Sequence, residues 1–391
     1  MAVSAATALA ATTVSPPKPL DLLVVYNGTL AGSSKGIGGG DQVMLKCINL
    51  SGIEPDILIP RSAQALIQRH GRLFFTMANW RLDTLGILVT FPVRVLQGVW
   101  HGWRQRHTYE IAVAVSGFAV DLIPLWFWKA RRKGAIVYHV IPERKAVNFA
   151  TRLRFGLAAL EQQLALRMLR HVCEYMVAGN EVTKRQLQAF LPGKPVFVLH
   201  AGFDAAALDR VASIPKDGKL ALFIGRLTSQ KGIFDLVKLM AEIRQEDPEF
   251  RLVMVGHGPD REFLLAEIQR LQLNNITLAG FITDEEKMRL LKQAAFFFFP
   301  SYEEGWGIAL AEALYCECRC VTYELEHYRP IFRDYPAYAR LGDWQDFLRA
   351  FREVRPRSVA ADQKSFLRQY NDPMIARQFV EHLKEIAAAS H

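Results

Sequence analysis

The amino-acid sequence predicts an α/β protein of two domains, each built on a parallel β-sheet with helices on both faces. The chain has 391 residues, which is long enough for two ordinary hydrophobic cores. Half of the residues are hydrophobic and 22% are charged, which is typical of a globular protein. Short apolar runs of strand length alternate with longer segments of helical periodicity, as they do in βαβ units.

The first domain is expected over residues 19–200, after a disordered tail at residues 1–18 that is rich in Ala and Thr. Its apolar runs are short and indicate buried parallel strands. These strands are predicted at 20–26, 111–116, 135–140 and 175–178, with helices at 41–50 and 148–170. A glycine-rich loop is expected between the first strand and the first helix. The start of the chain lacks the basic and leucine-rich segments of a secretory signal, and no apolar run is long enough to span a membrane.

The second domain is expected over residues 201–373, with the boundary near His200–Gly202. Its strands are predicted at 220–225, 251–256, 276–280, 295–300 and 319–323, and its helices at 233–245, 260–271, 284–293 and 307–316. The final helix, within residues 374–391, has no strand after it and is expected to cross back to the first domain. Each strand ends in Gly or Pro with polar residues, and open α/β sheets bind ligands outside the carboxyl ends of their strands.

Positive charge and tryptophan are concentrated in one segment of the first domain. The net charge is +9, and residues 61–155 hold 15 Lys and Arg against four acidic residues and five of the seven tryptophans. Those tryptophans are Trp80, Trp100, Trp103, Trp126 and Trp128. Lys and Arg are attracted to anionic lipid and Trp prefers the headgroup layer, so an anionic membrane surface is an expected partner. The alternative is a solvated basic face over a core that contains the tryptophans. Nucleic acid is not expected, because no recognised binding module accompanies the patch.

Five cysteines are an odd, sparse set, which favours a reducing cytoplasm, with association at the cytoplasmic membrane face as an extension of that expectation. Cys316, Cys318 and Cys320 alternate with single residues. This spacing lacks the two-residue gap of zinc knuckles, and no pair of histidines supports it, so no metal is expected and packing explains the cluster better.

Several strand ends carry groups suited to a phosphorylated ligand. Arg226 and Lys231, in the segment 225–232, would neutralise a diphosphate whose charge grows as a bond to it breaks. Gly39, Gly40 and Gly256 would let a ligand approach the backbone. The alternatives are ordinary surface cations and tight turns. The full G-x-G-x-x-G fingerprint does not appear in the first βα turn, which counts against an NAD enzyme.

The segment 300–312 carries the most informative pattern. Glu304 and Glu312 are eight residues apart, with Gly305 in the loop that opens the following helix. Carboxylates accept hydrogen bonds from vicinal hydroxyls, which sugars and ribose offer. Capping of that helix by Glu304 is the structural alternative. In the first domain, His139 is predicted at the carboxyl end of a strand, where it faces the cleft or serves a structural role.

Together these residues resemble the GT-B glycosyltransferases, in particular the retaining enzymes of family 4. The fold that this resemblance implies is two Rossmann-like domains whose parallel sheets face a central cleft. The E-x7-E pattern is matched by Glu304 and Glu312, and the basic pair on the diphosphate by Arg226 and Lys231. The family's cleft histidine falls on His139. Its glycine loop resembles Gly39-Gly40, and the loops around its nucleotide resemble residues 255–259, with Gly256, and 280–282, with Ile282.

The resemblance implies roles for these residues. Glu304 would hold donor hexose hydroxyls, Glu312 would bind the ribose, and His139 would help to position the sugar. Arg226 and Lys231 would stabilise the leaving nucleoside diphosphate. No protein nucleophile, metal or other cofactor is then required, because the nucleotide-sugar is a co-substrate. The sequence departs from the family pattern at residues 316–320 and at 324–331, where a glycine-containing loop is expected.

The expected activity is that of a retaining hexosyltransferase. It would use a UDP- or GDP-sugar and a membrane-associated glycan or lipid-linked acceptor, in polysaccharide or glycoconjugate biosynthesis. The first domain would bind the acceptor and the second the donor. Two alternatives stay open: a GT-B synthase that acts on a small soluble sugar, and a catalytically silent GT-B scaffold.

Overall fold

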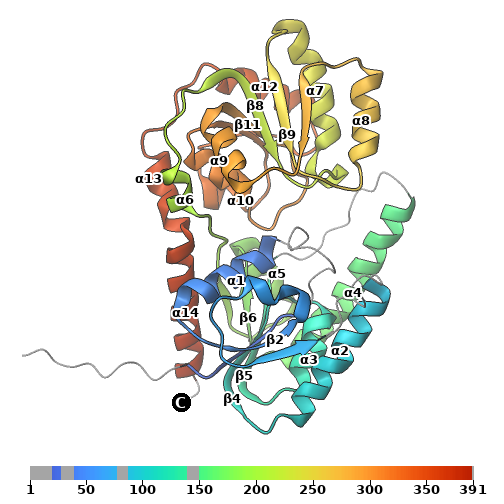
Figure 1. Ribbon diagram of the computed structural model, residues 1–391, viewed down its shortest axis with the longest axis vertical. Coiled ribbons are helices and arrows are strands. Elements are labelled where there is room, and N and C mark those ends of the chain that lie inside the picture. Colours follow the sequence, from blue (N-terminus) through green and yellow to red (C-terminus); the bar gives the residue numbers. More distant parts are fainter. Residues whose placement is uncertain (1–19, 28–38, 77–86, 139–148, 390–391) are drawn as a thin grey trace, which may run out of the picture.

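A computed structural model describes residues 20–27, 39–76, 87–138 and 149–389, and these residues form two parallel β-sheets (Figure 1). The first sheet has seven strands in the order β3-β2-β1-β4-β5-β6-β7, and the second has six in the order β10-β9-β8-β11-β12-β13. Neighbouring strands pair in parallel in both sheets. The prediction of an α/β protein with two parallel sheets is confirmed.

The first sheet comes from the N-terminal half of the chain. Its strands are β1 (Leu22–Val25), β2 (Asp56–Pro60), β3 (Leu73–Thr76), β4 (Tyr109–Ala114), β5 (Ala130–Val137), β6 (Tyr175–Ala178) and β7 (Val196–Val198). The helices that connect them are α1 (Gly39–Ser51), η2 (Arg61–Leu66), α2 (Ile87–Arg104), α3 (Ala119–Phe127), α4 (Phe149–Val172) and α5 (Glu181–Phe190).

The second sheet follows a short helix, α6 (Ala205–Arg210). Its strands are β8 (Asp217–Ile224), β9 (Arg251–Val255), β10 (Ile276–Gly280), β11 (Ala294–Phe299), β12 (Arg319–Tyr323) and β13 (Ala337–Ala339). The remaining helices are η4 (Ser229–Lys231), α7 (Ile233–Glu246), α8 (Arg261–Arg270), α9 (Asp284–Gln293), α10 (Ile308–Tyr315), α11 (Tyr328–Phe332), α12 (Trp344–Val354), α13 (Gln363–Leu367), η5 (Arg368–Tyr370) and α14 (Asp372–Ala388).

Alternate residues of the central strands point into different cores, because side chains of a β-strand alternate between the two faces of the sheet. In β1, Leu22 and Val24 belong to the cluster that includes α1 and α14, whereas Leu23 and Val25 belong to the cluster that includes α3 and α4. Figure 1 shows α1 and α14 on one side of this sheet and α2, α3 and α4 on the other. Burial on both faces explains why the strands read as continuous apolar runs.

The last helix connects the two halves of the chain. Helix α14 runs back along the first sheet beside α1 (Figure 1), and Lys46 of α1 donates to the Asp372 carboxylate at 2.9 Å. The same core cluster continues from α14 through Phe203 to α10 of the second sheet. A single apolar core therefore joins both sheets on this side.

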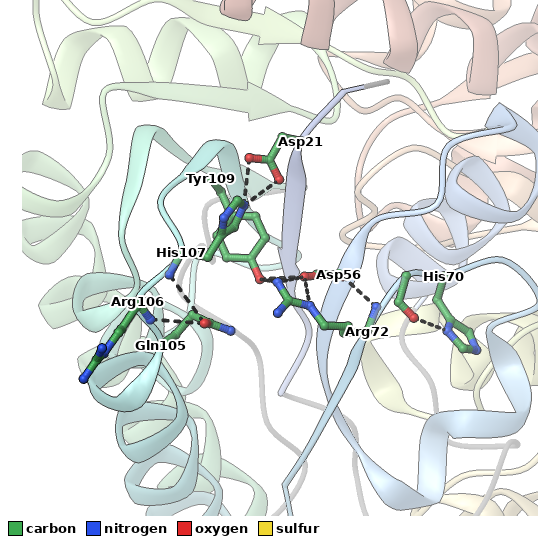
Figure 2. A network of polar contacts seen from close by, with 9 residues as sticks. Asp21, Asp56, His70, Arg72, Gln105, Arg106, His107 and Tyr109 are labelled. Carbon is green, nitrogen blue, oxygen red and sulfur yellow. Dashed lines mark hydrogen bonds and ion pairs between the residues drawn. The ribbon is translucent and has the colours of Figure 1, made fainter. Parts of the chain in front are cut away.

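A polar network ties the amino ends of the first sheet together (Figure 2). Tyr109, which begins β4, donates its hydroxyl to Asp56 of β2 at 2.7 Å, and Arg72 donates its Nε to the same carboxylate at 2.9 Å. Burial alone would raise the pKa of Asp56. The hydrogen bonds from Arg72 and Tyr109 lower the pKa by a larger amount, so it lies below its usual value. His107 pairs with Asp21, just before β1, at 2.9 Å. This edge is opposite the carboxyl edge, where ligands of parallel sheets bind.

The structure differs from the sequence analysis in several elements. Strands β2, β3, β7 and β13 were not predicted. Two of them have three residues each, which is too short for periodicity to reveal. Helix α1 begins at Gly39, so Gly39 and Gly40 lie in its first turn and not in the loop before it. None of the helices in the described part of the chain has the length and apolar composition that crossing a membrane requires.

The tryptophans of the basic segment fall into different environments. Trp128 is fully buried and packs edge-on against Phe74, with ring centroids 4.8 Å apart, so it belongs to the core. Trp100, Trp103 and Trp126 are exposed. Trp80 lies outside the described residues. The three thiols of the 316–320 cluster are buried in the core, and burial raises the pKa of Cys316 to about 12.

Candidate functional site

The carboxyl edges of the two sheets meet at a direct contact. Asn180 follows β6 and caps α5, where its side-chain oxygen accepts a hydrogen bond from the backbone N–H of Thr183. Its Nδ2 donates to the backbone oxygen of Gly305, in the connection between β11 and α10, at 2.7 Å. Asn180 is only 2% exposed. Since ligands of open α/β sheets bind beyond the carboxyl ends of the strands, this junction is the candidate site.

Residues 225–232, which we call the cation loop, connect β8 to α7. The loop ends at Gly232, whose φ of 67° lies in the left-handed region. A Cβ on Gly232 would lie 2.0 Å from the backbone oxygen of Pro300, so no side chain fits there. The backbone N–H of Tyr302 donates to the backbone oxygen of Gln230 at 2.8 Å. The cation loop is therefore packed directly against residues 300–307, which we call the glutamate loop.

Lys231 and Glu304 form an ion pair between the Lys Nζ and the Glu Oε1, where these loops meet. Their side chains are 22% and 18% exposed, so the pair is screened less than one at the open surface. An ammonium group that holds a carboxylate is also suited to an anionic phosphate. A carboxylate released from it accepts hydrogen bonds from hydroxyls. The pair thus brings a cation suited to phosphate into direct contact with a carboxylate suited to hydroxyl groups.

Arg226 lies apart from this pair. Its side chain is exposed, and it makes no hydrogen bond or ion pair with the residues that the structure describes. The backbone around it is a tight turn in which the N–H of Thr228 donates to the Arg226 oxygen at 2.8 Å. The structure thus brings Lys231, Glu304 and Gly305 together, whereas the guanidinium of Arg226 extends into solvent.

Glu312 has a partner that no sequence pattern indicates. It lies on α10, and its Oε1 accepts from the Nζ of Lys287, on α9, at 2.8 Å. Burial lowers the pKa of Lys287, but the charge and hydrogen bond of Glu312 raise it more, so the net pKa lies above its usual value. Both glutamates of the E-x7-E pattern are therefore paired with lysines. No local pattern could reveal Lys287, because it is 25 residues from Glu312 in the chain.

Asp235 supports the glutamate loop from behind. This residue lies in the first turn of α7 and is buried, and its Oδ2 accepts from the hydroxyls of Tyr302 at 2.6 Å and Tyr323 at 2.8 Å. Burial and the Asp235 carboxylate raise the pKa of both phenols, so both remain hydrogen-bond donors. Tyr302 is two residues before Glu304. Asp235 therefore fixes the loop that carries the glutamate, although no sequence pattern singles it out.

The turns after β9 and β10 form a third part of the site. Gly256 has a φ of 133°, and a Cβ there would lie 2.0 Å from the backbone oxygen of Gly225. The ring of His257 stacks on Phe281 with an interplanar angle of 11° and a centroid distance of 5.7 Å. Phe281 is 58% exposed, whereas Ile282 is half-buried against the core. This flat aromatic surface suits a planar ring.

On the first sheet, the predicted site residues are placed less completely. Gly39 and Gly40 form the start of α1. His139 lies outside the described residues, so its predicted role stays a prediction. Its neighbour Tyr138 is described, and the Tyr138 backbone oxygen accepts from the Thr183 hydroxyl at 3.3 Å.

Two histidines lie where the sheets meet. His200 is in the linker after β7, and His327 immediately precedes α11. Burial lowers the pKa of His327 to about 4, and the charge of His200 contributes to the decrease. Burial also lowers the pKa of His200, opposed by a hydrogen bond with Gly179 and the charge of Glu181. Both imidazoles are therefore neutral in the folded protein at neutral pH.

We expect acid to destabilise the fold through His327. In an unfolded chain its pKa is about 6.5, so between that value and its folded pKa the unfolded state binds more protons. Neutral His327 therefore contributes up to about 3 kcal/mol to the free energy of unfolding. This contribution is fully present above about pH 6.5 and is lost as the pH falls towards 4. Urea unfolding of the wild type and His327→Gln across this range measures it, with His70→Gln as an exposed control. Equal pH slopes in all three proteins would contradict the assignment.

The segment that forms the second sheet matches a known family model. Residues 204–354, which include all of β8–β13, match the family model described as Glycosyl transferases group 1. A phosphatidyl-myo-inositol mannosyltransferase of Mycobacterium tuberculosis is 27% identical over 231 residues, which cover 54% of this chain and 60% of that protein. The match thus spans less than two thirds of that relative's length.

Solved structures resemble nearly the whole chain. Sucrose-phosphate synthase from Thermosynechococcus elongatus superposes with a TM-score of 0.71 at 15% identity, covering 95% of this chain and 100% of that one. HepE from Anabaena, solved in complex with UDP and glucose, superposes with a TM-score of 0.68 at 14% identity, covering 94% and 99%. Similarity at this level of identity shows a shared fold, and it confirms the two-sheet arrangement implied by the resemblance noted in the sequence.

Proposed function

We propose that this chain, which has the GT-B fold of glycosyltransferases and a glycosyl transferases group 1 segment at residues 204–354, is a retaining hexosyltransferase. It moves a hexose from a UDP- or GDP-sugar to a glycan or lipid-linked acceptor held at a membrane, in polysaccharide or glycoconjugate biosynthesis. The second sheet binds the donor and the first sheet binds the acceptor.

The ion pair between Lys231 and Glu304 is the observation that carries this proposal. A nucleotide-sugar places a doubly charged diphosphate next to a ring of hydroxyls, and this pair offers one group for each. The diphosphate takes the ammonium of Lys231, and Glu304 accepts hydrogen bonds from the hexose. The structural similarity to HepE, whose solved complex contains UDP and glucose, supports a donor of this type.

Other residues complete the donor site under this proposal. Glu312 binds the ribose hydroxyls while Lys287 balances its charge. Gly256 and Ile282 border the base, and the stacked rings of His257 and Phe281 offer it a flat surface. Exposed Arg226 folds onto the diphosphate when the donor binds. Gly39 and Gly40, in the first turn of α1, place backbone N–H groups near the phosphates.

The transfer step follows from this placement. The bond from the anomeric carbon to the diphosphate oxygen breaks, and a bond from that carbon to an acceptor hydroxyl oxygen forms on the same face of the sugar. The acceptor proton passes to the departing phosphate. Lys231 and Arg226 stabilise the charge that develops on the diphosphate, so the proposal needs no metal. His139 helps to position the sugar at the anomeric carbon.

The acceptor is proposed to bind at the first sheet. The mannosyltransferase relative is named for a phosphatidyl-inositol acceptor, which supports a lipid-linked one here. A small soluble sugar is the second candidate, supported by the structural similarity to sucrose-phosphate synthase. A catalytically silent scaffold is the third. The proposed location is the cytoplasm, at the membrane face.

Donor binding can be tested by thermal unfolding with UDP, GDP, UDP-glucose and GDP-mannose. We expect the nucleotides of one base, either uracil or guanine, to raise the Tm. A ligand at about 100 times its Kd stabilises the folded state by about 2.7 kcal/mol. Glu312→Gln should remove most of this shift by weakening the ribose contact. Glu317→Gln, an exposed glutamate just beyond α10, is the matched control. No shift with any nucleotide would contradict the proposed function.

A further inference from the structure

The exposed face of α2 is apolar along nearly the whole helix. The exposed positions follow helical spacing, and their side chains are Val89, Pro92, Leu96, Trp100 and Trp103, followed by Arg104. Leu96 and Trp103 are 69% and 78% exposed. A surface helix normally presents its polar side to water and its apolar side to the core. The outer face of helix α2 instead presents apolar side chains to water.

The inner face of α2 shows that this orientation is fixed. Thr90 and Arg94 are buried, although both are polar. Gly98 and Gly102 lie against α3 and the residue after it. A Cβ on Gly98 would be 2.9 Å from the ring of Pro124, and one on Gly102 would be 2.7 Å from the indole of Trp128. That indole donates its N–H to the Gly98 oxygen at 3.2 Å. The helix cannot rotate its apolar face inward without breaking these contacts.

The end of α3 extends the same surface. Trp126 and Phe127 are exposed at the last turn of α3. The backbone of Phe127 is within 3.1 Å of the position that a Cβ on Gly102 would occupy, so the ends of the two helices are side by side. Figure 1 shows α2 and α3 together on the outer side of the first sheet. We call the exposed residues 89, 92, 96, 100, 103, 126 and 127 the α2–α3 ridge.

Cations surround the aromatic end of the ridge. The guanidinium of Arg104 lies over the ring of Trp100, 4.7 Å from its centroid. The Nζ of Lys133 donates to the backbone oxygen of Trp126 at 3.0 Å. Further exposed cations at this end are Arg106, Lys129 and Arg131. The sequence has no acidic residue in 89–106 or in 122–135. The positive charge at this end is therefore not balanced from within either segment.

We infer that the α2–α3 ridge is a docking surface for an anionic phospholipid bilayer. Indole rings prefer the headgroup layer, the side chains of Leu96 and Val89 enter the acyl boundary, and the flanking Arg and Lys meet lipid phosphates. A second protein would bury these apolar side chains equally well. It would not account for the cations around two of the tryptophans, which no acidic residue of either segment balances. The lipid surface is thus the occupant that both features fit.

The position of the ridge also matters for catalysis. In a parallel α/β sheet a connecting helix begins near the carboxyl edge and ends near the amino edge. The Val89 end of the ridge is thus the end closer to the junction with the second sheet. This consequence rests on the proposed function, because it would present a lipid-linked acceptor to the site. The bilayer contact itself does not depend on glycosyl transfer.

Flotation of the full chain with vesicles tests the inference. We expect the wild type to float at low salt with vesicles of phosphatidylcholine and phosphatidylglycerol, and to float less with phosphatidylcholine alone or at high salt. The triple variant Leu96→Ser, Trp103→Ser and Trp126→Ser should lose about tenfold in the vesicle-bound fraction. Arg104→Gln with Arg131→Gln should weaken binding only to the anionic vesicles.

A control variant carries the same kind of changes away from the ridge. Phe190, Phe263 and Leu341 are exposed large apolar residues on α5, on α8 and after β13, and their replacement by Ser should leave flotation unchanged. The inference is overturned if the wild type stays in solution at low salt, or if both triple variants float equally. It is also overturned if the wild type is a dimer that the ridge variant dissociates, without vesicle binding.

Nucleotide-induced thermal stabilisation separates this inference from the proposed function. The ridge variant should retain the wild-type Tm shift, because the substitutions are far from the cation and glutamate loops. Retained stabilisation with lost flotation supports the ridge. Flotation without any nucleotide-induced shift counts against the proposed donor and leaves the docking surface in place.

Discussion

Replacement of Lys231 by methionine should lower kcat for sugar transfer by about 10²–10³-fold. The ammonium contacts Glu304 and, under the proposed mechanism, faces the diphosphate whose charge grows as the glycosidic bond breaks. A contact that strengthens in the transition state lowers kcat and kcat/KM together when it is removed. Initial rates of nucleoside diphosphate release over a range of donor concentrations measure both constants.

The matched control is Lys219→Met. Lys219 also pairs with a carboxylate, that of Asp247 at 2.6 Å, but it lies near the amino end of β8 and away from the two loops. Its replacement should leave kcat within about twofold of the wild type, as remote surface substitutions usually do. An unchanged kcat in Lys231→Met, in a protein that unfolds at the wild-type temperature, would exclude Lys231 from the mechanism.

The double variant Lys231→Met, Glu304→Gln tests whether the two residues act together. Each single variant breaks the pair and leaves the other group without its partner. If the pair is a unit, the loss of activity in the double variant is smaller than the product of the single losses. Simple multiplication of the two effects would mean that phosphate and sugar are bound at independent positions.

Gly232→Ala should have the second large effect, on stability and activity together. The φ of 67° is costly for any residue with a Cβ, and the new methyl group would lie 2.0 Å from the backbone oxygen of Pro300. The two loops must then separate, at a cost of about 2–4 kcal/mol in the free energy of unfolding. Separation also moves Lys231 from Glu304. Chemical denaturation and donor turnover should therefore both report the change.

Gly218→Ala provides the comparison for this variant. Gly218 is in β8, its φ lies outside the left-handed region, and a Cβ there would have nothing within 4 Å. This substitution should be neutral or slightly stabilising, because alanine restricts the unfolded chain more than glycine does. If both variants unfold at the same denaturant concentration, the close approach of the two loops does not hold in solution.

Much of the fold could be predicted from the sequence because its information is local. The strands at 175–178, 276–280 and 319–323 and the helix at 284–293 agree with the structure to the residue. Each is an apolar run or an amphipathic stretch bounded by polar residues or glycine, and short-range sterics and burial decide such elements. The three-residue strands escaped prediction, because their existence depends on a neighbouring strand that supplies hydrogen bonds.

The candidate site divides in the same way. The sequence by itself determined the chemistry at the strand ends: a lysine before Gly232, a glutamate after β11, and a second glutamate on the next helix. Only the tertiary structure decided the partners, because Lys231 and Glu304 are 73 residues apart and Glu312 meets Lys287 across two helices. The orientation of α2 belongs to this second group as well. No local pattern decides which side of this helix is exposed, and the contacts of Gly98 and Gly102 with the α3 region fix it. Long-range packing selects one arrangement among several that local preferences allow, and no single segment of the chain determines which one is selected.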